Sequence, residues 1–158
     1  MGRPTYYDRQ ADPLPDGTFG FTSAADRQHE REVSDLIARA WNCELRPFGP
    51  LCAVDWYAIR DGRLAALLEL KSRSHDSGKF PTVFLNVRKW FALYMGSIGL
   101  NVPAFFVVRF QDGVKWIALA DIDARRHEMG GCRRIVKSHT DIEPVIHVPV
   151  EMMKPLGD

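Results

Sequence analysis

The sequence has few cysteines, no long apolar run and almost no net charge, and each of these absences removes a class of protein. Its three cysteines, Cys43, Cys52 and Cys132, are scattered and form no CxxC pair, which argues against a disulfide framework or a zinc site and favours a reducing cytoplasm. No apolar run approaches the roughly 20 residues that a membrane-spanning helix needs, and the polar N-terminus is not that of a signal peptide. We therefore expect a soluble, cytoplasmic protein that does not enter a membrane.

The charge balance also limits the partners of the chain. A net charge of +1 does not by itself attract nucleic acid, so such a partner would have to be bound by local basic patches. No repeat, low-complexity segment or linker divides the 158 residues. Proline and glycine are frequent at the start, which predicts an extended N-terminal arm over residues 1–21 and a single domain over residues 22–158.

Hydrophobic periodicity predicts an α/β domain with a central mixed β-sheet flanked by helices. The expected elements are a helix over 24–41, a hairpin over 53–71, a basic loop over 72–81, a helix over 87–100, a hairpin over 104–119, a short helix or turn over 121–128, and a strand pair over 132–137 and 145–150. The side chains expected to be buried on the two longer helices are Val33, Leu36, Ile37, Ala40, Trp41, Val87, Trp90, Phe91, Leu93, Tyr94 and Ile98.

Three charged residues, Asp55, Glu69 and Lys71, are out of place in the apolar hairpin over 53–71. A two-residue turn at Asp61-Gly62 leaves Glu69 on the opposite face from Asp55. A three-residue turn over 60–62, with its glycine in the left-handed conformation, brings all three side chains to one face. We predict the second register, or a bulge with the same effect. Two carboxylates and a lysine on one face would form a divalent-metal site.

Glu30, on the first predicted helix, has two interpretations. It lies about 50° from the centre of the buried stripe at 100° per residue, so its carboxylate points toward the body of the protein, where an unpaired carboxylate is costly. The helix position alone favours an edge side chain that reaches water. The alternative is a third acid of the metal site.

These pieces resemble a known motif. Glu30 on a first helix, Val54-Asp55 near the start of a hairpin, and Glu69-Leu70-Lys71 on its second strand are similar to the PD-(D/E)xK nuclease superfamily. Archaeal-type Holliday junction resolvases and small phage nucleases look most similar. The resemblance covers about residues 28–119 and has Val54 where the motif has proline. It implies a restriction-endonuclease-like core.

The resemblance also implies an activity, a Mg²⁺-dependent nuclease that hydrolyses phosphodiester bonds in DNA, with Mn²⁺ able to replace Mg²⁺. Asp55, Glu69 and the main-chain carbonyl of Leu70 would bind the metal, and Glu30 would add a ligand through water. Lys71 would orient the attacking water or stabilise charge on the phosphate. A structure-selective endonuclease such as a Holliday junction resolvase would imply a homodimer. The setting would be a bacterial or phage-infected cell.

Basic residues around the motif are candidates for contact with DNA phosphates. The predicted contacts are Arg73, Lys79, Arg88 and Lys89. Lys89 lies in the helix after the motif, where relatives often carry a supporting basic or polar residue. A second function remains open, in which a nuclease-fold protein binds nucleic acid or a protein partner without cutting.

Overall fold

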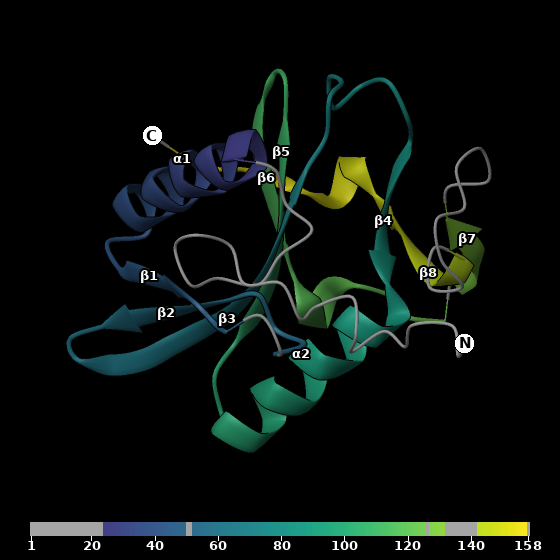
Figure 1. Cartoon of the computed structure of the whole chain (residues 1–158). Coiled ribbons are helices and arrows are strands. Elements are labelled where there is room, and N and C mark those ends of the chain that lie inside the picture. The colour runs from purple at the N-terminus through teal and green to yellow at the C-terminus, as the bar shows by residue number, and fades with distance from the viewer. Residues whose placement is uncertain (1–23, 50–51, 126, 132–141, 158) are drawn as a thin grey trace, which may run out of the picture.

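The computed structural model describes residues 24–49, 52–125, 127–131 and 142–157, and within them the chain forms two α-helices and two β-sheets (Figure 1). The helices are α1 (Ala24–Ala40) and α2 (Val87–Leu100). The larger sheet has the order β1-β2-β3-β5-β6-β9, with β1 Glu44–Pro47, β2 Trp56–Arg60, β3 Arg63–Ser72, β5 Ala104–Phe110, β6 Gly113–Ala118 and β9 Lys154–Pro155. The smaller sheet has the order β4-β8-β7, with β4 Thr82–Asn86, β8 Ile142–Pro149 and β7 His127–Gly131. Two 3-10 turns, Leu119–Asp121 and Val150–Met152, complete the described elements.

The larger sheet is mixed and lies between the helices, as the sequence predicted. Strands β3 and β5 are parallel, and the other neighbours are antiparallel. Helices α1 and α2 lie on opposite sides of this sheet, and the smaller sheet stands on the side of α2 (Figure 1). The cluster under α1 is made of Val33, Ile37, Trp56, Ala58, Ala66, Leu68 and Val107. The cluster on the side of α2 includes Leu67, Leu85, Leu93, Phe106, Val108 and Ile146. Strand β3 is therefore covered on both faces, which explains its almost continuous apolar sequence.

The turn of the β2–β3 hairpin differs from the expected one. Asp61 and Gly62 both have positive φ, 51° and 71°, and Arg60 pairs with Arg63. This is a two-residue turn, so the prediction of a three-residue turn is wrong. Asp-Gly readily takes this conformation because its twist matches that of the flanking strands.

A β-bulge then restores the expected face. The register shifts between Ala58 and Ile59, so that β3 contributes one extra residue there. Beyond the bulge Trp56 pairs with Leu68, and continuing that register sets Asp55 opposite Glu69. The alternative prediction of a bulge with the same effect is confirmed, because the extra residue reverses the alternation of side chains along the rest of the pair.

The smaller sheet was predicted only in part: β8 overlaps the strand expected over 145–150, whereas β4 and β7 were not expected. Residues 82–86 form β4, and residues 127–131 form β7 where a helix or turn ending at 128 was expected. Strand β8 pairs with both of them. These segments are strands because they form hydrogen bonds with a distant part of the chain. The pattern of residues within each segment does not indicate such long-range pairing. The expected arm over 1–21 and strand over 132–137 lie outside the described residues.

Helix α2 has the predicted bounds but not the predicted burial. Leu93 is buried, whereas Phe91, Tyr94 and Ile98 are 56%, 43% and 59% exposed. With Met95, which is also exposed, they recur at three- and four-residue spacing and form one side of the helix, which we call the apolar face of α2. Leu36 of α1, expected to be buried, is exposed as well. These helices are apolar over a wider arc than the sheet covers.

Among the described helices, none is both long and apolar enough to cross a membrane.

Candidate active site

A pair of carboxylates meets one ammonium group beside β3. Asp55 lies directly before β2 and Glu69 lies in β3, and the bulge brings them to the same face. Lys89, in the first turn of α2, donates from Nζ to Oδ1 of Asp55, and the same Nζ lies 3.2 Å from Oε2 of Glu69. The two carboxylates therefore lie within reach of a single cation.

Because Glu69 is buried, ionisation of both carboxylates depends on a nearby cation. The pKa of Glu69 is raised to about 9, first because burial removes water from its carboxylate, and then because of the hydrogen bond and negative charge of Asp55. Burial lowers the pKa of Lys89, but the charges of Glu69 and Asp55 outweigh that effect and raise it overall. Two adjacent carboxylates ionise together only when positive charge offsets their repulsion. The site therefore favours a cation between Asp55 and Glu69.

The donor set at this position fits a divalent metal. The buried Oε2 atom of Glu69 forms the ion pair with Lys89 but accepts no hydrogen bond. A buried acceptor without a hydrogen-bond donor is unfavourable. Mg²⁺ prefers oxygen ligands and usually keeps several waters. No group of three or more His, Cys, Asp or Glu side chains suited to a metal occurs within the described ranges. Asp55 and Glu69 would thus be the two side-chain ligands, with a main-chain carbonyl and waters completing the shell.

Lys71 lies on the same face of β3 but has its own partners. Its Nζ donates to the main-chain oxygen of Phe84 at 3.0 Å and lies 3.5 Å from Oδ1 of Asn86. Burial and then the charge of Arg73 lower the pKa of Lys71 to about 8, against the raising effects of Glu69 and Glu143. The ammonium is therefore held by β4, next to the carboxylate pair rather than in contact with it.

Glu30 approaches β3 from the other side. With His29 and Val33 of α1 it lines a hollow of about 320 Å³ whose other wall is residues 69–72 of β3. Helix α1 packs on the sheet face that carries Leu68, whereas Glu69 projects from the α2 face. The structure thus brings Glu30 next to the strand that carries the motif. Its role as a ligand stays a prediction.

The four predicted phosphate contacts are in different places. Lys89 contacts the carboxylates, and Nε of Arg88 lies 3.7 Å from Oε2 of Glu143. Arg73 lines a hollow beside Arg109, and Lys79 is an exposed residue of the loop after β3, with its Nζ 5.5 Å from the centre of the Phe80 ring. Contact with DNA stays a prediction for all four residues.

Two polar residues near Lys71 were missed by sequence reasoning, namely Asn86 and Glu143. Asn86 stands directly before α2, so the sequence offered a helix-start signal at that position but no partner for its side chain. Glu143 belongs to β8, and only the pairing of β8 with β4 brings it here.

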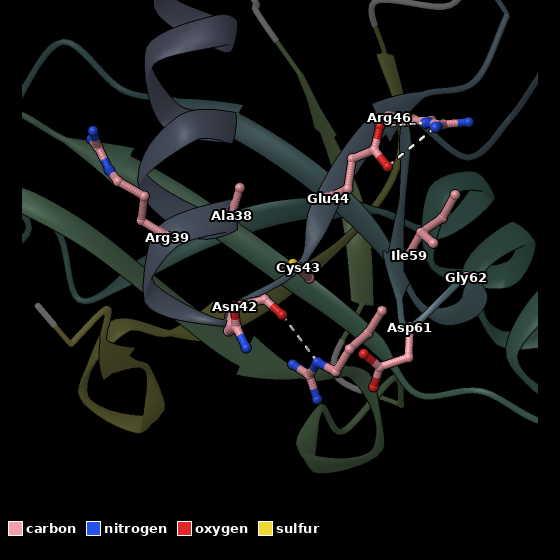
Figure 2. Close-up of a pocket in the computed structure, with 10 residues that line it drawn as sticks. Ala38, Arg39, Asn42, Cys43, Glu44, Arg46, Ile59, Asp61 and Gly62 are labelled. Atoms are coloured by element: carbon pink, nitrogen blue, oxygen red, sulfur yellow. Dashed lines mark hydrogen bonds and ion pairs between the residues drawn. The ribbon is translucent and has the colours of Figure 1, made fainter.

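A larger hollow of about 930 Å³ lies at the other end of the β2–β3 hairpin (Figure 2). It is bounded by the end of α1, by β1 and by the turn at Asp61 and Gly62. Three of its charged groups have partners: Nε of Arg46 lies 2.7 Å from Glu44, and Nε of Arg60 donates to the carbonyl of Asn42. It includes none of the motif residues. The carboxylate pair, and not this hollow, carries the recognisable chemistry.

Comparisons with known proteins identify the family and the fold of the chain. A family model described as phage putative PDDEXK endonuclease matches residues 19–156. Among solved structures, Hjc, a Holliday junction resolvase from the archaeal hyperthermophile Archaeoglobus fulgidus, matches with a TM-score of 0.56 and 9% sequence identity, over 84% of this chain and 93% of that chain. At this identity the match shows the fold, and it confirms the predicted restriction-endonuclease-like core. A search of curated proteins finds no match.

Proposed function

The chain belongs to the family of phage putative PDDEXK endonucleases, and on this premise we propose that it is a Mg²⁺-dependent nuclease that hydrolyses phosphodiester bonds in DNA. One observation carries the proposal: the Asp55 and Glu69 carboxylates share one cation position, and Lys71 follows Glu69 by two residues on the same strand face. Carboxylates that hold a metal, with an ammonium beside them, can support metal-assisted phosphodiester hydrolysis.

Each motif residue has a proposed role. Asp55, Glu69 and the carbonyl of Leu70 would hold Mg²⁺ or Mn²⁺, which would supply Lewis-acid chemistry and a water of lowered pKa. The ammonium of Lys71 would orient the attacking water or stabilise the charge that develops on the phosphate. Glu30 acts as a ligand through water, a role supported by its place in the hollow beside β3.

The test is a cleavage panel over linear duplex, circular, single-stranded and four-way DNA, and a single-stranded RNA, in Mg²⁺, Mn²⁺ and EDTA. We expect cleavage of at least one DNA form in both metals and none in EDTA. Binding of DNA with a steep salt dependence but without cleavage in any metal would support the alternative, a nuclease-fold protein that binds without cutting.

The preferred substrate that we propose is branched DNA, cut by a homodimer. The structural neighbour Hjc is a Holliday junction resolvase, and a four-way junction presents pairs of equivalent strands to two equivalent sites. The apolar face of α2 supports the dimer, because exposed apolar side chains gathered on one surface are typical of a protein–protein contact.

Replacing Ile98 by Glu is expected to convert the proposed dimer into a monomer. The new carboxylate would be buried in the interface without a partner. We expect the free-energy cost, which arises twice in a symmetric dimer, to exceed the free energy of association. Light scattering after size-exclusion chromatography measures the mass directly. Met152→Glu, at another exposed apolar side chain, is the matched control. A wild-type protein that stays monomeric at micromolar concentration would rule out the dimer.

Replacing Lys89 by Met is expected to destabilise the metal-free protein and to strengthen metal binding. The buried carboxylate of Glu69 loses its cation, at a cost of about 1–3 kcal/mol in the free energy of unfolding. A metal ion no longer competes with the ammonium. Urea unfolding in EDTA and calorimetric titration with Mn²⁺ measure the two effects, with Lys79→Met as control. Weaker Mn²⁺ binding by Lys89→Met would show that the ammonium does not occupy the metal position.

A further inference from the structure

The ammonium of Lys71 is held by the smaller sheet. Its Nζ donates to the carbonyl of Phe84 at 3.0 Å and lies 3.5 Å from the amide oxygen of Asn86. An ammonium group has three donors and no acceptor, and a half-buried one needs such oxygen partners in place of water. Strand β4 therefore determines where the positive charge of Lys71 lies.

The side chain of Asn86 is in turn oriented by Glu143. The amide nitrogen of Asn86 donates to Oε1 of Glu143. An ionised carboxylate accepts hydrogen bonds and donates none, so it selects the NH₂ group of Asn86 and turns the amide oxygen toward Lys71. The other oxygen of Glu143, Oε2, lies 3.7 Å from Nε of Arg88. Glu143 is on β8, whose pairing with β4 places Asn86 opposite Val145.

A second observation indicates that the orientation of the Asn86 side chain does not serve to stabilise α2. Asn86 occupies the N-cap position of α2, yet its side chain makes no capping hydrogen bond. An asparagine at this position ordinarily stabilises the helix by accepting from a backbone N–H of the first turn. Here the side-chain oxygen is turned to Lys71 instead, so the helix gives up a contact that the residue type could provide.

We propose that Asn86 and Glu143 are positioning residues, which hold the Lys71 ammonium beside the Asp55–Glu69 pair. The smaller sheet thereby completes the active site. This inference rests on the nuclease activity proposed above and extends it to β8, a strand that carries none of the motif residues. Neither residue needs to touch the substrate or the metal, because each acts through Lys71.

The test is a double-mutant cycle on the cleavage rate. Glu143→Ala is made in the wild type and in Lys71→Met, and single-turnover rates are measured at saturating Mg²⁺ and DNA. We expect a loss of about 10-fold to 100-fold in the wild type, the range found when a supporting hydrogen-bond partner of an active-site group is removed. In the Lys71→Met background we expect no further loss, because no ammonium remains to be positioned. Binding of DNA should not weaken, because Glu143→Ala removes a negative charge and leaves Arg88 in place.

Further variants separate positioning from a structural role. Glu143→Gln retains an oxygen that can accept from Asn86, so we expect a smaller loss than in Glu143→Ala. Asn86→Ala interrupts the same link from its other side and should show the same dependence on Lys71. Glu151→Ala removes an exposed carboxylate just beyond β8 and should have no effect. Thermal unfolding of each variant shows whether it is folded.

The outcomes distinguish this inference from the proposed function. Equal losses in the wild-type and Lys71→Met backgrounds, or a lower unfolding temperature with an unchanged rate, would overturn the positioning role and leave the nuclease intact. A wild-type protein that cleaves nothing in the panel would overturn the proposed function and this inference with it.

Discussion

Replacing Glu69 by Gln is expected to abolish divalent-metal binding and to lower the cleavage rate by about 10³-fold or more. The amide has nearly the same size as the carboxylate but lacks its charge, so the metal keeps Asp55 as its only directly bound carboxylate while Lys89 competes for that carboxylate. Lewis-acid stabilisation by a metal contributes several kcal/mol, and about 4 kcal/mol corresponds to a factor of 10³.

Calorimetric titration with Mn²⁺ and single-turnover cleavage measure the two losses. Glu151→Gln, an exposed carboxylate outside the site, is the control and should behave as the wild type. Cleavage by Glu69→Gln at a rate within ten-fold of the wild type would show that the metal is bound elsewhere.

The same variant should change how stability depends on pH in the metal-free protein. The pKa of Glu69 is raised to about 9 in the folded state, whereas an unfolded glutamate titrates near about 4.3. The folded state therefore holds the proton more tightly, and this contribution to stability is fully present below about pH 4.3 and is lost as pH rises through about 9. Urea unfolding in EDTA should show wild-type stability falling from pH 5 to pH 8. Glu69→Gln should lack the part of this decrease that comes from the Glu69 carboxyl. Equal slopes of the unfolding free energy against pH in the two proteins would contradict the prediction.

Replacing Lys71 by Met is expected to lower the cleavage rate by about 10²-fold to 10³-fold, the range observed when one group that stabilises transition-state charge is removed. Methionine matches the lysine side chain out to Cε and lacks the ammonium. The variant should still bind Mn²⁺, because the carboxylates are untouched, and this separates it from Glu69→Gln.

Lys115→Met on β6 is the matched control, since Lys115 is a partly exposed lysine of the same sheet, away from the carboxylates. An unchanged cleavage rate in Lys71→Met would remove Lys71 from the site. A simultaneous loss of Mn²⁺ binding would mean that the substitution acts through the fold of β3 and not through charge.

Local signals in the sequence predicted the elements that are defined by their own periodicity. Helix α2 begins and ends where the apolar spacing indicates, and the Asp-Gly and Gln-Asp-Gly turns mark both hairpins of the larger sheet. Glu69 and Lys71 were expected on one face because side chains alternate along a strand, so residues two apart point the same way. Such features depend only on neighbouring residues, so one sequence suffices to predict them.

The features that depend on distant residues were predicted less well. The common face of Asp55 and Glu69 required an extra residue in β3, and the sequence does not distinguish a bulge from a longer turn. Phe91, Tyr94 and Ile98 were expected to be buried because they are apolar, but burial is decided by how much of α2 the sheet covers.

By itself the sequence determined the helix and hairpin positions, the type of residue in the motif and the superfamily. Tertiary structure alone decided that Lys89 reaches the two carboxylates, that β8 brings Glu143 to Asn86, and that the ammonium of Lys71 rests on β4. The physical reason is the range of the interactions. Backbone conformation and side-chain alternation are local, whereas an ion pair or a hydrogen bond between side chains far apart in the chain exists only after sheets and helices have packed.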